Sequence, residues 1–279
     1  MSDQGIALSG HFPSETVDAL FAAVEVDDVV DPEVSLPEPI LVSCSDETIA
    51  RCLQLCLQFW AEGASREALL GLTRTLLLKG DLSLDERIRY KHIRARYKHL
   101  RFALTLYDVR HRPPPLFSVT VGVMGNLQDA FRNGRGRAVT FYARVLQALL
   151  APPVWAAIRR RLGAVRLEGA AGFTEYRRSE IRRLKERLGR EELTGHEFHS
   201  VRKIVSRQVS FYDTLRSLDH QEHDYRMSRF LSAINGLMGQ RHDEMVEQAL
   251  SGERDYRTAE ELDPDIRQRL ETLVARYPL

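Results

Sequence analysis

The sequence predicts an all-α protein built from a tandem repeat of four helices, and three observations lead to this prediction. From Asp46 onward, apolar residues recur at three- and four-residue intervals, which is the period of an amphipathic helix. Short polar or Pro/Gly breaks separate these periodic segments, so neighbouring helices should run antiparallel and pack as bundles. Two short motifs of the first four segments return in the same order in the second four.

Each expected helix is bounded by a break that disfavours helical backbone. The main breaks are Gly80, the prolines at 113–115, the prolines at 152–153, the stretch 163–172 and Gly189. The expected helices run over residues 46–61, 65–79, 84–110, 116–150, 153–162, 174–188, 195–218 and 222–250, with a terminal helix from Pro264.

The segment before the first break reads differently. Residues 1–45 hold four prolines, one short candidate helix (15–24) and one candidate strand (40–43), so we expect an irregular extension. The expected domains are this extension (1–45), a first four-helix bundle (46–150), a second four-helix bundle (151–260) and a C-terminal helix (261–279).

The formal net charge of +1 hides a separation of charge along the chain. Residues 1–50 contain eleven acidic residues and no Lys or Arg, so the rest of the chain carries +12. A body this basic favours a polyanionic partner, although solubility alone would also explain the asymmetry. An acidic leader could fold over the body and compete with that partner, in which case deleting residues 1–45 should raise the affinity for it.

Length and composition exclude several classes of protein. The 279 residues are 28% charged, and neither a long uncharged apolar run nor a basic start followed by an apolar run is present. We therefore expect no membrane span, no signal peptide, no membrane partner and a cytoplasmic location. Cys44, Cys52 and Cys56 cannot all pair with one another and lack metal-site spacing, so we expect buried thiols.

The internal repeat rests on two pairs of aligned segments. These pairs are 91–100 with 199–208, and 124–129 with 238–243. The first alignment places Arg94 on Arg202 at an offset of 108 residues, and the second places Asp129 on Asp243 at an offset of 114. Two matches in one order and at nearly one offset favour a duplication.

The third expected helix carries an unusual density of positive charge. Between Arg87 and Arg101 there are seven basic residues, two histidines and no acid. Five of these cations share one stripe, with a charge about every 5 Å along the axis: Arg87, Lys91, Arg94, Lys98 and Arg101. An apolar stripe lies roughly 110° around the same helix: Tyr90, Ile93, Tyr97, Leu100, Leu104 and Tyr107.

A cationic stripe that flanks the buried face can line a groove, which an outward-facing stripe could not do. Arg and Lys at this density favour phosphate oxygens, which accept from the planar guanidinium fork and from the mobile ammonium. The seventh expected helix carries a thinner array of the same kind: His196, His199, Lys203 and Arg207. A solvated face whose charges are merely tolerated is the alternative interpretation.

Two motifs in these segments carry a family resemblance. His199, Arg202 and Arg207 fit the pattern His-x-x-Arg-x-x-x-[Arg/Lys]-[Arg/Lys]-x-Arg, and the first copy has Arg94, Lys98, His99 and Arg101 at matching places. Met238-Gly239, His242, Asp243 and Val246 are similar to Leu-Gly-x-x-[His/Arg]-Asp-x-x-Val, with Met124-Gly125, Gln128 and Asp129 as a looser copy. Over about residues 46–260 the chain thereby resembles the CHAD family, the conserved-histidine α-helical domain.

The resemblance implies two four-helix bundles related by a pseudo-twofold axis, with a basic central channel that binds inorganic polyphosphate. It implies no catalysis, no cofactor and no bound metal. The residues expected to bind polyphosphate are Arg87, Lys91, Arg94, Lys98, His99, Arg101, His199, Arg202, Lys203, Arg207 and His242. Asp129 and Asp243 are expected to orient neighbouring Arg or His side chains.

The chain departs from the family pattern at several positions. Lys91 stands where a histidine is expected, Ser206 and Val209 replace basic residues of the second copy, and Gln128 replaces a basic residue or histidine. We therefore expect the first half to dominate binding.

Two other functions remain open for the same residues. Nucleic acid could bind these cations, although the basic stripe lacks the interleaved aromatic side chains that stack on bases. The pairs His196/His199 and His220/His223 could begin a metal site of a phosphate-handling protein, although their spacing is not that of zinc proteases. The sequence leaves the oligomeric state open.

Overall fold

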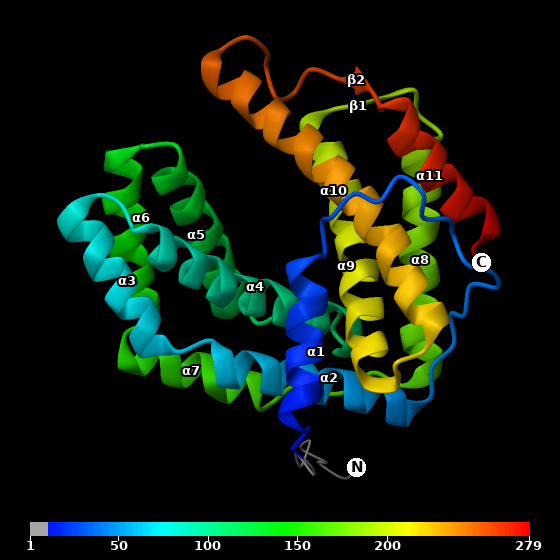
Figure 1. The fold of residues 1–279 in the computed structure, drawn as a ribbon, viewed down its shortest axis with the longest axis horizontal. Coiled ribbons are helices and arrows are strands. Elements are labelled where there is room, and N and C mark those ends of the chain that lie inside the picture. Colours follow the sequence, from blue (N-terminus) through cyan, green and yellow to red (C-terminus); the bar gives the residue numbers. More distant parts are fainter. Residues whose placement is uncertain (1–10) are drawn as a thin grey trace. The chain divides into compact units, whose positions relative to one another are not determined.

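The computed structural model describes residues 11–279 and is mostly helical, which confirms the all-α prediction (Figure 1). The helices of this part are α1 (Ser14–Glu25), α2 (Asp46–Gly63), α3 (Arg66–Lys79), α4 (Leu84–Tyr107), α5 (Pro115–Arg132), α6 (Gly136–Leu149), α7 (Pro152–Leu162), α8 (Ala170–Leu188), α9 (Gly195–Asp219), α10 (Glu222–Ser251) and α11 (Pro264–Arg276). The strands β1 (Glu192–Leu193) and β2 (Glu260–Glu261) form a small antiparallel pair. The first ten residues of the expected extension lie outside the described residues.

The expected helix over residues 116–150 is two helices in the structure. α5 ends at Arg132 and α6 begins at Gly136, and between them Gly134 has a φ of +63°. A left-handed residue interrupts the helical hydrogen-bond ladder, and glycine adopts this conformation without a steric penalty. The sequence prediction was wrong here because the flanking apolar residues Phe131 and Ala138 are seven residues apart and keep one helical phase, although residues 132–137 hold no apolar side chain. The candidate strand at residues 40–43 was also wrong, since this segment is irregular chain.

The two helices that carry the cationic motifs begin with the same capping arrangement. In α4, Glu86 N donates to Ser83 Oγ at 3.4 Å while Ser83 N donates to Glu86 Oε2 at 2.9 Å. In α9, Glu197 N donates to Thr194 Oγ1 at 3.3 Å while Thr194 N donates to Glu197 Oε2 at 3.1 Å. Because these reciprocal bonds satisfy two backbone donors, each cationic helix has a firmly held first turn.

The apolar stripe predicted for α4 is buried at all six of its positions. Tyr90 Oη donates to the carbonyl oxygen of Met124 on α5 at 2.9 Å. Tyr97 stacks on Phe117 of α5 with ring centroids 5.6 Å apart. α4 therefore packs its aromatic side chains against α5, which fixes the rotation of α4 and hence the direction of its cations.

The chain forms two compact units. Of the described residues, the first unit contains 11–12 and 53–167, and the second contains 13–52 and 168–279. In the first unit, α3 and α5 each contact α4 and α6, and α7 contacts α6. In the second unit, α9 contacts α1, α8 and α10, while α11 contacts α8 and α10.

Residues 13–45, which the sequence predicts as an extension apart from the bundles, pack into the second unit. The residues that α1 buries include Leu20 and Val24. Beyond α1, Asn235 Nδ2 donates to the Asp27 carbonyl oxygen at 2.7 Å, and a Cβ atom on Gly236 would clash with the Asp28 carbonyl oxygen. The leader backbone therefore lies directly on α10, because the apolar face of α1 and the carbonyls that follow it need partners.

A buried arginine secures the end of this leader. Arg177 of α8 is fully buried, and its guanidinium lies 4.1 Å from the ring centroid of Phe211. It donates to the Val42 carbonyl oxygen at 3.2 Å and to Gln208 Oε1 at 3.0 Å. These hydrogen bonds satisfy the buried cation and tie the leader to α8 and α9.

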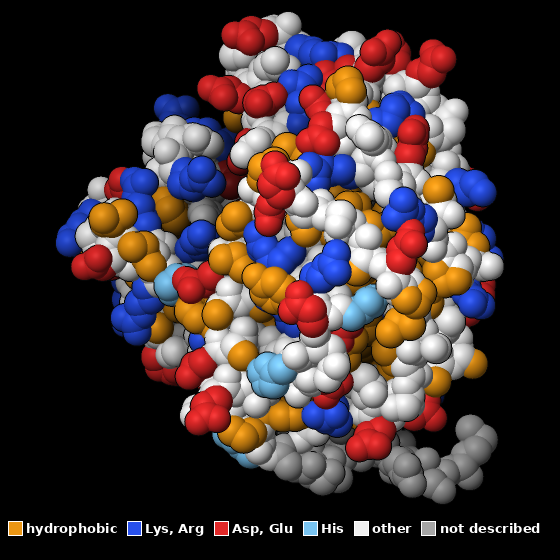
Figure 2. All heavy atoms as spheres, turned by 45° about the vertical axis from the view of Figure 1, so that its right-hand side comes forward, with side chains coloured by type: hydrophobic (Ala, Val, Ile, Leu, Met, Phe, Trp, Pro, Cys, Tyr) orange, Lys and Arg blue, Asp and Glu red, His pale blue; other side chains and the backbone are white. Residues whose placement is uncertain are grey.

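The charge separation along the sequence is not reproduced on the face drawn in Figure 2, where acidic and basic side chains are interspersed. One reason lies in the second unit, where the leader carboxylate Glu38 lies 2.6 Å from Arg276 of α11.

Cys52 and Cys56 are buried as expected, whereas Cys44 is partly exposed. Within residues 11–279 no single helix has the length and apolarity to cross a membrane. α6 and α7 reach that length and apolarity only when taken together, and they are bent by 65° relative to each other.

Candidate functional site

The central contact of the first unit joins an arginine of the cationic stripe to a glycine. A Cβ atom on Gly125 of α5 would stand 3.2 Å from Nη2 of Arg94 of α4. Gly125 is buried, and it leaves room for the guanidinium against the α5 backbone. Within the described residues, the buried atoms Arg94 Nε and Gln128 Oε1 make no hydrogen bond. Two facing helices of this unit thus hold polar groups whose hydrogen-bonding capacity is not used.

The second unit contains the same contact at the aligned positions. A Cβ atom on Gly239 of α10 would stand 3.0 Å from Nη2 of Arg202 of α9. The repeat alignment of the sequence pairs Arg202 with Arg94 and Gly239 with Gly125. Both units therefore place a motif arginine on a motif glycine of the helix that follows it in the chain.

Two motif histidines lie beside this second contact. His199 of α9 and His242 of α10 face each other with ring centroids 4.8 Å apart and an angle of 30° between the rings. Tyr256 packs edge-on to His242 at 6.2 Å, and its ring lies against Gly195. Burial raises the pKa of Tyr256, while the nearby Arg202 opposes that rise. We call His199, Arg202, His242 and Tyr256 the histidine–arginine cluster.

The five cations of the α4 stripe lie at the border between the core and the solvent. Lys91 is exposed, and the other four are partly exposed. Arg87 pairs with Asp81 and lies over the Phe131 ring at 5.7 Å. Lys98 and Arg101 approach the ring of Phe102 at 5.8 and 5.6 Å. This placement agrees with a stripe that flanks the buried face.

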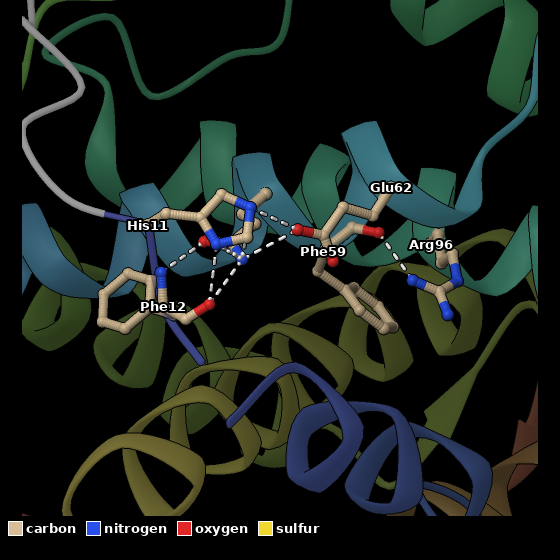
Figure 3. A network of polar contacts seen from close by, with 6 residues as sticks. His11, Phe12, Phe59, Glu62 and Arg96 are labelled. Carbon is tan, nitrogen blue, oxygen red and sulfur yellow. Dashed lines mark hydrogen bonds and ion pairs between the residues drawn. The ribbon is translucent and has the colours of Figure 1, made fainter. Parts of the chain in front are cut away.

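One further arginine of α4 turns away from the stripe. Arg96 points toward α2, where its Nη1 donates to the Phe59 carbonyl oxygen at 2.7 Å (Figure 3). Its guanidinium also lies 4.3 Å from the Phe59 ring centroid and against Gly63. In the same network, His11 Nε2 lies 2.9 Å from Glu62 Oε1. The role of Arg96 is to join α4 to α2.

Two residues expected to bind polyphosphate have protein partners in the interior. His99 is 4% exposed and packs edge-on to Phe59 at 5.7 Å. Arg207 Nε donates at 2.6 Å to Oε2 of Glu180, a residue that is 2% exposed. Glu180 therefore offsets the charge of Arg207, and Lys203 of the same helix is the exposed cation.

The two aspartates expected to orient neighbours are both exposed. Asp243 Oδ1 lies 3.7 Å from Nδ1 of His242, the residue that precedes Asp243 in the motif. Asp129 lies on α5 one residue after Gln128. Burial raises the pKa of Tyr90 of α4, and the negative charge of Asp129 adds to that rise. Asp243 is thus adjacent to the histidine–arginine cluster in the second unit.

The histidine pairs do not assemble a metal-ligand set in the described part of the chain. Residues 11–279 hold no group of three or more His, Cys, Asp or Glu side chains arranged around one ion position. His223 Nε2 lies 2.8 Å from the Pro39 carbonyl oxygen, and His220 is exposed at the end of α9.

Sequence reasoning missed Tyr256 as a member of the cluster. Tyr256 comes from the loop after α10, and no local pattern connects it with residues that lie some distance back on α9. The arginine–glycine contacts had a sequence signal, since a glycine recurs at the aligned position of each half.

No family model matches this chain, and neither a curated protein nor a solved structure matches it.

Proposed function

We propose that this protein is a non-catalytic receptor for inorganic polyphosphate, built from two copies of a helical repeat like that of the CHAD family. The observation that carries the proposal is the contact of Arg94 with Gly125, matched by the contact of Arg202 with Gly239. Two arginines held on glycines at aligned positions support a duplicated site. An arginine held in this way presents its fork with little loss of side-chain entropy, which favours binding to phosphate oxygens.

The proposed ligand residues in the first unit are the stripe cations around Arg94, and those in the second unit are the histidine–arginine cluster with Lys203. A polymer that carries negative charges at short intervals matches a ladder of cations better than a single anion does. The first unit should dominate because it has five cations on one helix face. In this proposal the two arrays line one basic channel about a pseudo-twofold axis. The buried Cys52 and Cys56 thiols fit a reducing compartment, so we propose that the protein acts in the cytoplasm.

The first test is the binding of labelled long-chain polyphosphate to immobilised protein at about 50 mM and about 200 mM salt. Affinity should fall steeply with salt because each neutralised phosphate releases counterions. Replacing Arg94 and Lys98 together by Ala should weaken binding about a hundredfold or more, since each of the two lost charged contacts is worth about 1.5–3 kcal/mol.

The matched control for this test removes Arg159 and Arg160, which are exposed on α7 and lie outside the proposed site. This variant loses the same charge from the same unit and should bind polyphosphate within about twofold of the wild-type protein. Binding that ignores salt, or equal losses in the two variants, would contradict the proposal.

A second test addresses the glycine contact itself. Gly125→Ala should displace the Arg94 guanidinium and weaken polyphosphate binding, while the chain still folds, because the end of a side chain can move aside. Gly122→Ala on the same helix meets no atom within 4 Å and should leave binding unchanged. Affinity is measured for both variants beside their circular dichroism spectra. If Gly125→Ala and Gly122→Ala bind polyphosphate with equal affinity, Gly125 is not part of the binding site.

Two rival functions are outcomes of the same assays. Excess duplex or single-stranded nucleic acid should not displace polyphosphate, whereas efficient displacement would favour nucleic-acid binding by the same cations. Release of orthophosphate from the polymer in the presence of a divalent metal would favour a phosphate-handling enzyme instead.

A further inference from the structure

A groove in the second unit lies apart from the residues proposed to bind polyphosphate. It consists of two adjoining cavities of about 260 and about 520 Å³, which share Ala19, Arg216 and Tyr225. The larger cavity is also lined by Ala22 and Ala23 of α1. These small side chains form an apolar wall, and the opposite side carries two arginines from α9 and α10.

The two arginines of the groove have few strong partners for their charge. Arg216 has a side chain that is 12% exposed, and its Nε makes no hydrogen bond within the described residues. Its guanidinium lies 5.2 Å from the ring centroid of Tyr225, which is 48% exposed. Arg229 donates to the backbone carbonyl oxygens of Val26 at 2.9 Å and Val29 at 3.3 Å.

A buried carboxylate lies behind these arginines. Asp213 is 1% exposed and its Oδ1 lies 3.4 Å from Arg216 Nε. Ser228 Oγ donates to Oδ1 at 2.6 Å, but Oδ2 has no hydrogen-bond partner among the described residues. Burial raises the pKa of Asp213 to about 7. Arg216 on its own helix and Arg229 on α10 oppose this rise, and Asp27 of the leader adds to it.

We propose that this groove binds a small organic monocarboxylate, whose carboxylate meets Arg216 and Arg229 and whose apolar body lies between the alanine wall of α1 and the Tyr225 ring. Within residues 11–279, the larger cavity is lined by Arg216 and Arg229 and by no acidic side chain, whereas Glu222 lines only the smaller cavity. Asp213 behind the larger cavity offsets one of the two positive charges when it is ionised, and the remaining charge matches a monoanion. An apolar wall beside them favours a ligand with a hydrophobic body over a small hydrated ion. This site goes beyond polyphosphate binding and uses none of its residues.

The geometry also makes binding dependent on pH. When Asp213 takes up a proton, it no longer repels an incoming carboxylate and no longer offsets the charge of Arg216. Ligand binding and protonation of Asp213 therefore favour each other by linkage. The affinity should accordingly be higher at about pH 6 than at about pH 8.

The experiment is a fluorine NMR titration of the whole protein with para-fluorobenzoate at about pH 6 and about pH 8. The neutral isostere para-fluorobenzamide is the comparison, and it should bind about tenfold more weakly or worse. Arg216→Gln should lower benzoate affinity about tenfold or more. Arg226→Gln removes the same charge from an exposed site on α10 outside the groove, and it should change affinity less than about twofold.

Two more variants test the groove without removing an arginine. Ala19→Leu fills the space from the partly exposed side of α1 and should abolish binding while leaving every charge in place. Asp213→Asn should bind at about pH 8 as tightly as the wild-type protein does at about pH 6, with little further pH dependence. His220 also lines the smaller cavity, and His220→Gln should keep the pH difference.

Equal affinity for benzoate and benzamide would overturn this assignment, and so would undiminished binding by Ala19→Leu. A protein that fails to bind polyphosphate but shows these benzoate responses would refute the first proposal and support this one.

Discussion

At the scale of single residues, α10 uses two glycines to receive two different kinds of neighbour. Gly239 lies against the end of the Arg202 side chain, whereas Gly236, one turn earlier, lies against the backbone carbonyl of Asp28. A guanidinium can swing aside when a methyl group is added, but a backbone carbonyl moves only with its whole segment. The two glycines therefore should differ in how they tolerate alanine.

Gly236→Ala should destabilise the protein by about 2 kcal/mol or more, because overpacking against backbone forces a shift of the chain. Gly122→Ala is the control, since it adds a methyl group in open space on an exposed helical position. That control should gain about 0.5–1 kcal/mol of stability from its better helix propensity. Urea unfolding followed by circular dichroism measures both, and a Gly236→Ala protein as stable as the wild type would contradict the packing described for the leader.

At the scale of elements, a buried ion pair joins α8 to α9. Glu180 of α8 is 2% exposed and accepts a hydrogen bond from Arg207 of α9. Arg183, also on α8, places its Nη1 atom 3.2 Å from Glu180 Oε1. The pair explains why Arg207 contributes to packing within the second unit. It also explains how a helix as rich in arginine as α8 is held against its neighbour.

Glu180→Gln should destabilise the second unit by about 3–5 kcal/mol, because it leaves Arg207 without its full counter-charge in the interior. Glu175→Gln is the control on the same helix. Glu175 pairs with Arg182 where both side chains are largely exposed, so its loss should change stability by about 1 kcal/mol or less. The two midpoints of urea unfolding give the comparison, and similar midpoints would show that the Glu180 pair is not a stabilising link.

The elements also show where local sequence information ends. The amphipathic period predicted the buried stripe of α4, since side chains three and four residues apart share a face. Apolar residues on the two sides of Gly134 keep one helical phase, and this concealed the break between α5 and α6 although residues 132–137 hold no apolar side chain. One left-handed residue ends a helix without altering the pattern of apolar residues on either side.

At the scale of the whole molecule, the acidic leader has a structural role beside any effect of its charge. Leu20, Leu36 and Val42 of the leader are buried, and each such side chain is worth about 1.5–3 kcal/mol. Deleting residues 1–45 should therefore lower the midpoint of thermal unfolding as well as change charge. A truncated protein with an unchanged midpoint would contradict the packing of the leader in the second unit.

The hypothesis that the leader competes with polyphosphate needs variants that keep this core. Glu15→Gln with Asp18→Asn removes two exposed charges from α1 and leaves its buried residues in place. The affinity for polyphosphate should rise in this variant if the leader competes, and an unchanged affinity would leave the leader with its structural role alone.

Most of the helices, the cationic stripe of α4 and the alignment of Arg94 with Arg202 follow from the amino-acid sequence alone, because periodicity and motif spacing depend on residues close together in the chain. Folding adds the contacts of these arginines with Gly125 and Gly239, the pairing of Glu180 with Arg207, and the packing of the leader on α10. Such contacts join residues far apart in sequence, and their free energy depends on the burial and alignment that only the folded chain provides.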